Sequence, residues 1–365
     1  MIAQDLRRTN SGLIRYNAQD SVFFQANLAD QYMTQLVTRY ATTPLEYVQF
    51  GTSTISGNVG WGSTTPDSAM LLCRVNGNLV INSGSSLTAT SRKRGMILLV
   101  AGDMTVNGIV SMTGRGASGI VGQRLFTVQT SKSVTVDLPA TGGAGAAGTY
   151  WTANNATSAW PGVSGTSGVS ILSGGGGGSG STFCYDWNLT GGSAAGTSGK
   201  GGTASVFSGG SGGGGAVSFN GSTSLANAVG GAGADNGGAG GAYGVNDQGN
   251  NPSVGGGAGN PGGSGYGPSG IAGDAGTAGL LMIFCLGTLT INSTGSLVSK
   301  GANGGVGHGA GGAGGGGIIL AYGKNFINSG TISAAGGIGG VGMTFNTAHA
   351  NGGNGGAGYT SVGFL

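Results

Sequence analysis

Short apolar runs alternate with polar turns over much of the chain, in a pattern typical of β-strands. Four similar units occur, at 71–87, 96–109, 280–297 and 318–332. Each has an apolar run, a turn, a second apolar segment that ends in Asn, a Gly corner and a further apolar residue. Aliphatic and β-branched runs favour strands, while Asn and Gly tolerate the conformations that tight corners need. Stacked units of this kind share one core, so we expect short parallel β-solenoid-like coils, built as a β-helix or as a sandwich.

One segment near the N-terminus has helical spacing instead. Its apolar residues recur every fourth position after Ser21, which is a favourable N-cap. This pattern predicts an amphipathic helix over 21–41. An apolar face of this kind must pack on the chain's own β-structure or on another chain. We interpret the helix as an attachment element with these apolar positions: Phe24, Leu28, Tyr32, Leu36 and Tyr40.

Glycine has a period of its own. The chain has 87 glycines in 365 residues, and they recur at every third position in tracts such as 267–279, 301–307 and 311–317. Three residues per turn is the period of a polyproline-II-type helix, and glycine lets such backbones approach closely enough to hydrogen-bond. Only 7 prolines are present, which excludes collagen. We expect a bundle of about eight to ten short polyglycine-II helices, with loose glycine-rich coil as the alternative.

These patterns divide the chain into four parts. We expect an N-terminal attachment segment with one helix at 1–65, a first pair of β-coils at 66–140, a glycine-rich insertion with aromatic loops at 141–279, and a second pair of coils with further glycine tracts at 280–365. The predicted fold class is mostly β and irregular, with solenoid-like coils, a polyglycine-II bundle and a small helical segment.

The amount and distribution of charge argue against one class of partner, nucleic acid. Charged residues make up 7% of the chain and the net charge is +3, and most of the charged residues precede residue 125. The distal part has no basic stripe with interleaved aromatic residues, which argues against nucleic acid. The run Arg92-Lys93-Arg94 is expected to be a solvated turn. The N-terminus has no apolar signal region, so we expect synthesis in a cytoplasm without secretion by the standard route.

Catalytic and metal-binding patterns are absent from the sequence. His308 and His349 have no nearby carboxylate to orient them. Cys73 and Cys285 lie in apolar runs typical of core positions, and no Cys pair has metal-ligand spacing. We therefore expect no enzyme activity, no metal and no cofactor.

The aromatic residues between the glycine tracts are the best candidates for a binding face. Rigidly held aromatic side chains give contact area at low entropic cost. Alternatively, they cap the bundle and cover its edges. The candidate binding residues are Tyr150, Trp151, Trp160, Tyr185, Trp187, Tyr243, Phe345 and His349.

Tracts such as Ala310-Gly311-Gly312-Ala313-Gly314-Gly315, alternating with aromatic loops, resemble the adhesins at the tips of long tail fibres in T4-like bacteriophages. The resemblance covers 141–358, while 1–140 does not resemble that family's attachment domain. It implies a layered polyglycine-II bundle whose distal loops contact a receptor on the host cell. It implies no catalytic residue.

We therefore expect a virion structural protein of a phage tail, a fibre or tip adhesin made in the host cytoplasm. The helix at 21–41 would be its virion attachment element, and the eight candidate aromatic and histidine residues would be its host-binding residues. Its partners would be other tail or fibre proteins and a host-surface receptor, either an outer-membrane protein or a polysaccharide. The oligomeric state stays open. One alternative is a purely architectural tail or capsid decoration subunit. Another is a polysaccharide depolymerase, which would need two facing acids among Asp186, Asp235, Asp247 and Asp274.

Overall fold

The structure is a computed structural model, and no helix occurs among the residues that it describes. These residues are 13–17, 22–25, 45–66, 70–93, 95–118, 124–128, 134–138, 141–142, 149–153, 160–161, 182–186, 196–197, 214, 216–219, 243–245, 256–258, 263–265, 270–274, 278–307, 310–342 and 351–364.

The chain winds through successive rounds of three strands, which we call coils. The first three coils are β3 (Leu45–Phe50), β4 (Ser53–Ile55) and β5 (Asn58–Trp61); β6 (Met70–Val75), β7 (Leu79–Ile81) and β8 (Ser86–Ala89); and β9 (Gly95–Val100), β10 (Met104–Val106) and β11 (Ile109–Ser111). The fourth coil is β22 (Leu280–Ile291) and β23 (Ser296–Val298), the fifth is β24 (Ile318–Asn328) and β25 (Thr331–Ser333), and β26 (Tyr359–Phe364) follows. In coils four and five, one long strand takes the place of the first two.

Each strand pairs in parallel with the equivalent strand of the next coil. Met104, for example, lies between Leu79 of the second coil and Leu289 of the fourth. Because β22 pairs with β9 through its first half and with β10 through its second, two sets of strands join into one nine-stranded, nearly closed sheet. The predicted parallel β-structure is confirmed, and the four sequence units correspond to coils two to five. The structure also contains a first coil, at 45–61, which the four sequence units did not include.

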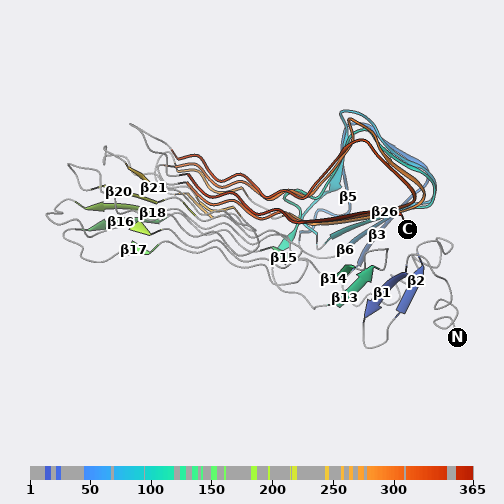
Figure 1. The fold of residues 1–365 in the computed structure, drawn as a ribbon, viewed down its shortest axis with the longest axis horizontal. Helices are drawn as coiled ribbons and strands as arrows, with labels where there is room; N and C mark the ends of the chain where they lie inside the picture. Colours follow the sequence, from blue (N-terminus) through green and yellow to red (C-terminus); the bar gives the residue numbers. More distant parts are fainter. Residues whose placement is uncertain are drawn as a thin grey trace.

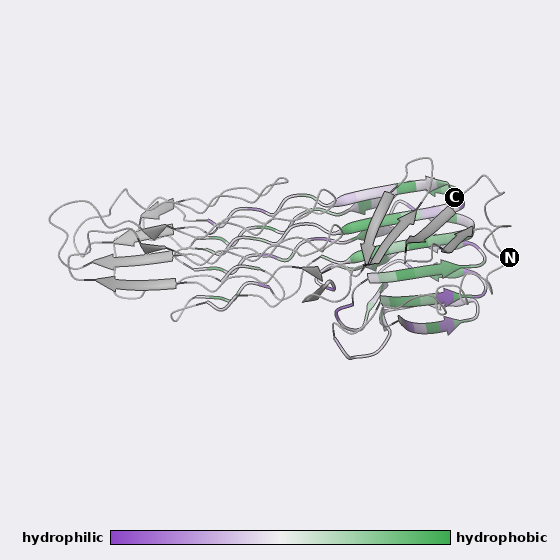
Figure 2. Cartoon of the chain, turned by 90° about the horizontal axis from the view of Figure 1, so that it is seen from below, coloured by the Kyte–Doolittle hydropathy of each residue, from purple (hydrophilic) through white to green (hydrophobic). Residues whose placement is uncertain are grey.

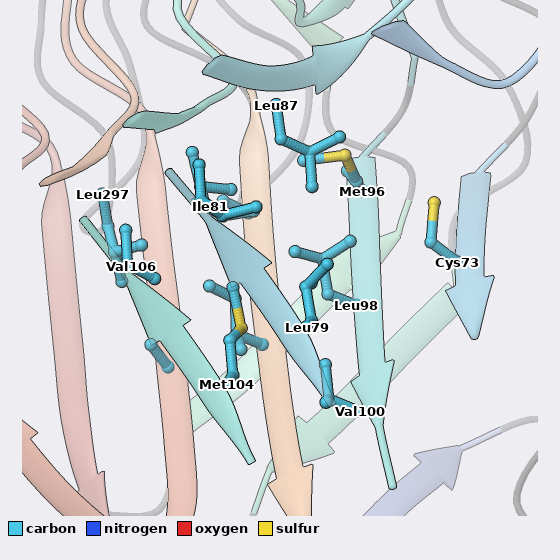
Figure 3. Close-up of a cluster of buried hydrophobic side chains, with 14 of the residues drawn as sticks. Cys73, Leu79, Ile81, Leu87, Met96, Leu98, Val100, Met104, Val106 and Leu297 are labelled. Carbon is cyan, nitrogen blue, oxygen red and sulfur yellow. The ribbon is translucent and has the colours of Figure 1, made fainter. Parts of the chain in front are cut away.

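One hydrophobic core runs along the inside of the coils. Alternate residues of each strand point into it because side chains of a strand alternate between faces. Figure 3 shows Leu79, Leu98 and Met104 gathered between the sheets, and all three are fully buried. Cys73 and Cys285 belong to this core, as their apolar sequence settings predicted. The stacked rings of Phe50 and Trp61, 4.2 Å apart, lie at the first coil.

The glycine tracts leave the coils at a single corner. Each of the three long connections begins after the last strand of one coil and ends at the first strand of the next. They are 112–279 after β11, 299–317 after β23 and 334–358 after β25. Since the coils are stacked, these connections start beside one another. In Figure 1 the described tracts, drawn in orange and red, run from this corner toward the end of the molecule where β16, β18 and β20 lie.

Backbone hydrogen bonds between tracts follow the period of three. In the inner tract 310–317, every residue is buried. Its amides at Gly311, Gly314 and Gly317 donate to carbonyls of tract 299–307 at N···O distances of 2.8 to 3.0 Å. Amides at residues 313 and 316 donate to tract 351–358, and its carbonyls accept from tracts 334–342 and 256–258. One tract thus bonds to four neighbours, whereas a strand in a sheet bonds to two.

A second apolar surface lies on the outside of β6, β9, β22 and β24. The residues that alternate with the core positions are also buried, among them Leu72, Leu99 and Met282. The rings of Phe284 and Tyr322 are stacked on this face at 6.2 Å. Figure 2 shows the resulting hydrophobic strands, apolar on successive residues rather than on alternate ones. Strands buried on both faces have this composition.

An antiparallel sheet is drawn below β3 and β6 in Figure 1. Its order is β14 (Val134–Leu138), β13 (Arg124–Val128), β1 (Leu13–Asn17) and β2 (Val22–Gln25). Apart from Arg124 at one end, the register positions on one of its faces are apolar: Ile14, Tyr16, Val22, Phe24, Phe126, Val128, Val134, Val136 and Leu138. The opposite face carries most of the polar residues, including Arg15, Thr127 and Asp137. An amphipathic sheet of this kind suits packing on the outer apolar surface of the coils.

The helix predicted over 21–41 is wrong where the structure describes it. Residues 22–25 form β2, in which Phe24 lies opposite Ile14 and Val22 opposite Tyr16. The short run Val22-Phe23-Phe24 fits a strand as well as a helix because it is both β-branched and aromatic, and pairing with β1 decides the outcome. The rest of the predicted helix lies outside the described residues.

Lys93 is a second correction, because the sequence predicted a solvated turn there. Its ammonium is fully buried and donates to Glu46 Oε2 at 2.6 Å, Ser63 Oγ at 3.0 Å and the Thr65 carbonyl at 3.0 Å. Glu46, the chain's single glutamate, also accepts hydrogen bonds from the amide and the hydroxyl of Ser63. Partial burial opposes ionisation of this carboxyl, but these hydrogen bonds outweigh it and lower its pKa. The pair joins the first coil to the connection between the second and third.

Candidate binding surface

Four parallel strands lie together at the end of the molecule opposite the coils. They are β16 (Thr149–Ala153), β18 (Thr182–Asp186), β20 (Ala216–Phe219) and β21 (Tyr243–Val245), in that order across the sheet. Parallel neighbours require a long crossover between them, so the chain returns to this end once for each strand. We call these four strands the distal sheet.

The register of the distal sheet brings aromatic residues from distant segments together. Tyr150 lies opposite Phe183, and Tyr185 lies opposite Phe219. Because alternate positions of a strand share a face, these four residues belong to one face. Neighbouring strands are about 4.8 Å apart, so these four register positions adjoin one another across three strands. The other register positions of that face are Thr152, Val217 and Gly244, and none of them is charged.

The opposite face of the distal sheet is less aromatic. Trp151 lies opposite Cys184, which lies opposite Ser218, and Tyr243 lies opposite Ala216. A two-stranded sheet of β17 (Trp160–Pro161) and β19 (Gly196–Thr197) accompanies these strands, and β19 lies close to both β18 and β20. The smaller sheet therefore lies beside the two central strands of the distal sheet.

Five of the eight candidate host-binding residues are on these strands. Tyr150 and Trp151 are in β16, and Trp160, Tyr185 and Tyr243 are in β17, β18 and β21. We expected them on loops, but the backbone places them in paired strands. Trp187, Phe345 and His349 lie outside the described residues. Phe183 and Phe219 belong to the same group of aromatic residues between the glycine tracts, but they are not among the eight named candidates. A Thr followed by an aromatic residue, in Thr149-Tyr150 and Thr182-Phe183, is a shared pattern that could have identified related strands.

The predicted attachment residues are less completely described. Phe24 lies on the apolar face of the antiparallel sheet, which places it in the chain's own β-structure. Leu28, Tyr32, Leu36 and Tyr40 lie outside the described residues.

Described residues offer little reactive chemistry. Within the ranges given above, no three His, Cys, Asp or Glu residues lie close enough to hold a metal ion. Burial raises the pKa of the Cys285 thiol to about 11, with a smaller contribution from Asp103, and burial raises that of Cys73 further. Asp274 is exposed on a glycine tract, and Asp186 is at the end of β18. Asp235 and Asp247 fall outside the described residues.

No part of the chain that the structure describes contains a helix of the length and apolarity that a membrane span would need. Comparison with known protein families, curated proteins and solved structures found no match to this chain.

Proposed function

We propose that this protein is a structural component of a bacteriophage tail, a fibre or tip adhesin that recognises the host-cell surface through its distal sheet. The observation that carries the proposal is the grouping of Tyr150, Phe183, Tyr185 and Phe219 at the end of the molecule farthest from the coils. Flat, uncharged aromatic surfaces bind neutral partners through burial of apolar area. The partner would be an outer-membrane protein or a surface polysaccharide.

We also propose that the coils form a β-solenoid and that the tracts are polyglycine-II helices. Support for the second assignment is the period of three in the hydrogen bonds, together with the four bonded neighbours of the inner tract. Backbones linked in several directions resist bending more than a single extended chain does. Stiff tracts would hold the distal sheet away from the virion without charged or catalytic side chains.

Adsorption of the purified full-length chain to a panel of bacterial strains tests the function. Two double variants, one for each face of the distal sheet, accompany the wild-type protein. Tyr150→Ala/Tyr185→Ala removes aromatic rings from one face, and Trp151→Ala/Tyr243→Ala removes them from the other. Ile109→Ser changes an exposed side chain of the coils and serves as the control.

The proposal expects Tyr150→Ala/Tyr185→Ala to lose adsorption by about tenfold or more, as for an interface hot spot, with an unchanged thermal melting curve. Trp151→Ala/Tyr243→Ala, on the opposite face, is expected to adsorb as the wild type does. If Tyr150→Ala/Tyr185→Ala adsorbs as the wild type does, recognition by this face of the distal sheet is refuted. If the folded chain binds no strain, an architectural role without a ligand replaces it.

A further inference from the structure

The stack of coils ends in a step on the side of coil five. β26 pairs with the first half of β24 only, at Ile318–Gly323. Among the described residues, no strand pairs with the second half of β24 or with β25 on the side away from the fourth coil. The sixth round of the chain therefore covers one side of the stack, and the other two sides end at coil five. We call residues 325–333 the open edge.

The hydrophobic core is incompletely covered at this step. Phe326 and Ile332 pack on the core but are only half-buried. On β26, Val362 lies beside the core residue Ala321, and Phe364 shares its face; they are 36 and 65% exposed. The positions equivalent to Phe326 and Ile332 in coils two to four are fully buried, and these are Leu79, Met104, Leu289, Leu87, Val110 and Leu297. A further coil covers each of those positions, and its absence here accounts for the difference.

The other end of the stack is closed by aromatic residues. Phe50 and Trp61 are stacked at the first coil, and no large apolar side chain in the described part of that coil is exposed. Edge strands usually carry charges or proline, which prevent pairing with another chain. The open edge has neither, because its sequence is Asn-Phe-Ile-Asn-Ser-Gly-Thr-Ile-Ser, with Lys324 just before it. An unprotected edge beside a half-covered core is suited to the addition of a strand.

The coils themselves show what kind of segment covers such an edge. Residues 289–298 cover coil three through parallel backbone pairing. They have the sequence Leu-Thr-Ile-Asn-Ser-Thr-Gly-Ser-Leu-Val, with apolar residues at alternate positions, a Gly corner and no charge. Residues 79–87 and 104–110 have the same pattern. In strand addition, backbone pairing gives affinity and alternate side chains give specificity.

We propose that the open edge binds an extended, uncharged segment of a partner protein, which adds two short parallel strands to the step. The segment is about ten residues long, as 289–298 is. Its apolar residues lie beside Phe326 and Ile332 and cover Val362 and Phe364 from the core side. This contact continues the interface that successive coils already form with one another. The inference does not depend on the adhesin function.

Binding of a labelled synthetic peptide to the full-length chain tests the proposal. The probe peptide copies residues 287–299 with blocked ends, and the control peptide carries Leu289→Ser, Ile291→Ser and Leu297→Ser. Fluorescence anisotropy is expected to show saturable binding of the probe with a dissociation constant of about 100 µM or below, and binding of the control weaker by about tenfold or more. Hydrogen exchange is expected to slow in 324–333 and to stay unchanged in 45–61, at the other end of the stack.

Two variants of the protein test which face of the edge is used. Phe364→Asp puts a charge on the core side, whereas Ile327→Asp puts one on the outer face, because Ile327 alternates with the core-facing Phe326. Both side chains are more than half exposed, so we expect both variants to fold, which thermal melting monitors. Phe364→Asp is expected to weaken binding of the probe by about tenfold or more, since an unpaired charge would be buried. Ile327→Asp is expected to bind as the wild type does.

Four results would overturn the proposal. They are no saturable binding of the probe, equal binding of the control peptide, protection confined to 45–61, and unchanged binding by Phe364→Asp. Sedimentation velocity examines the remaining occupant, a second copy of this chain. Self-association of the wild type that Phe364→Asp abolishes would assign the edge to that copy and overturn the partner segment.

Discussion

Replacing Gly311 by alanine tests the packing of the inner tract directly. A Cβ built on this residue would lie 1.8 Å from the carbonyl oxygen of Gly256 and 2.4 Å from its carbon. Real Cβ atoms keep at least 3.0 Å from such atoms, so the two backbones must separate by about 1.2 Å, the difference between these values. The obstacle is a backbone atom, which a change of side-chain rotamer does not relieve.

The cost follows from the hydrogen bonds that such a shift breaks. The Gly256 carbonyl accepts from the Gly305 amide at 2.8 Å, and the neighbouring Ala258 amide donates to Gly312 at 2.9 Å. A buried hydrogen bond left without a partner costs about 1–3 kcal/mol, so two cost about 2–6 kcal/mol. Alanine recovers about 0.4–1 kcal/mol by restricting the unfolded chain. The expected net destabilisation is about 2–5 kcal/mol.

Hydrogen exchange followed by mass spectrometry measures this effect locally, which suits a chain of several parts that need not unfold together. Peptides that cover 299–317 are expected to exchange about 30-fold faster or more, since each 1.4 kcal/mol is a factor of ten. Gly51→Ala is the control, because nothing lies within 4 Å of its added Cβ. Equal exchange in Gly311→Ala and Gly51→Ala would refute close backbone packing between the tracts.

Three further predictions concern the coils. Glu46→Gln leaves the buried Lys93 ammonium without a carboxylate. The variant is expected to lower the free energy of unfolding, measured with denaturant at pH 7, by about 2–4 kcal/mol. This is somewhat less than for a fully buried pair, because Glu46 is 19% exposed. The folded-state pKa of Glu46 is lowered from 4.5, so the stabilisation by this carboxylate is present above pH 4.5 and is lost as pH falls through the lowered pKa. The difference in unfolding free energy between wild type and variant should therefore disappear at low pH. A difference that stays constant with pH would contradict the ion pair between Glu46 and Lys93. Cys285, buried and with a pKa of about 11, is expected to resist iodoacetamide at pH 8 until the protein is denatured; rapid labelling of the native protein would contradict its core position. Phe24→Asp puts a charge on the apolar face of the antiparallel sheet and is expected to expose the outer surface of the coils, which increased binding of a hydrophobic dye would report; Gln25→Asp, on the opposite face, is the control and should bind no additional dye.

Local patterns determined the coils and the tract period. The apolar run Met96-Ile97-Leu98-Leu99-Val100, the Asn that closes the next segment and the Gly corner predicted strands and turns within each unit. Similar units stack because each has an apolar face that only an identical neighbour covers. The same reasoning placed Cys73 and Cys285 in the core. Glycine at every third position likewise predicted the spacing of the hydrogen bonds at Gly311, Gly314 and Gly317.

Contacts between distant segments determined the rest. The strand at 22–25 depends on pairing with β1, and β1 pairs with β13 more than 100 residues later, so a helical period nearby in the sequence was misleading. Lys93 is buried because Glu46, 47 residues earlier, lies above it in the stacked coils. Nothing next to Lys93 in the sequence distinguishes it from a solvated lysine.

The arrangement of the tracts and the distal sheet is also a tertiary property. The sequence predicted that tracts exist, but the stacking of the coils makes every long connection leave at the same corner, and only then do the tracts become neighbours. The same alignment brings Tyr150 opposite Phe183 across more than 30 residues of chain. Composition and period can be read from a single segment. Which residues share a face, and which charge is buried, depend on the distant segments that the fold brings alongside.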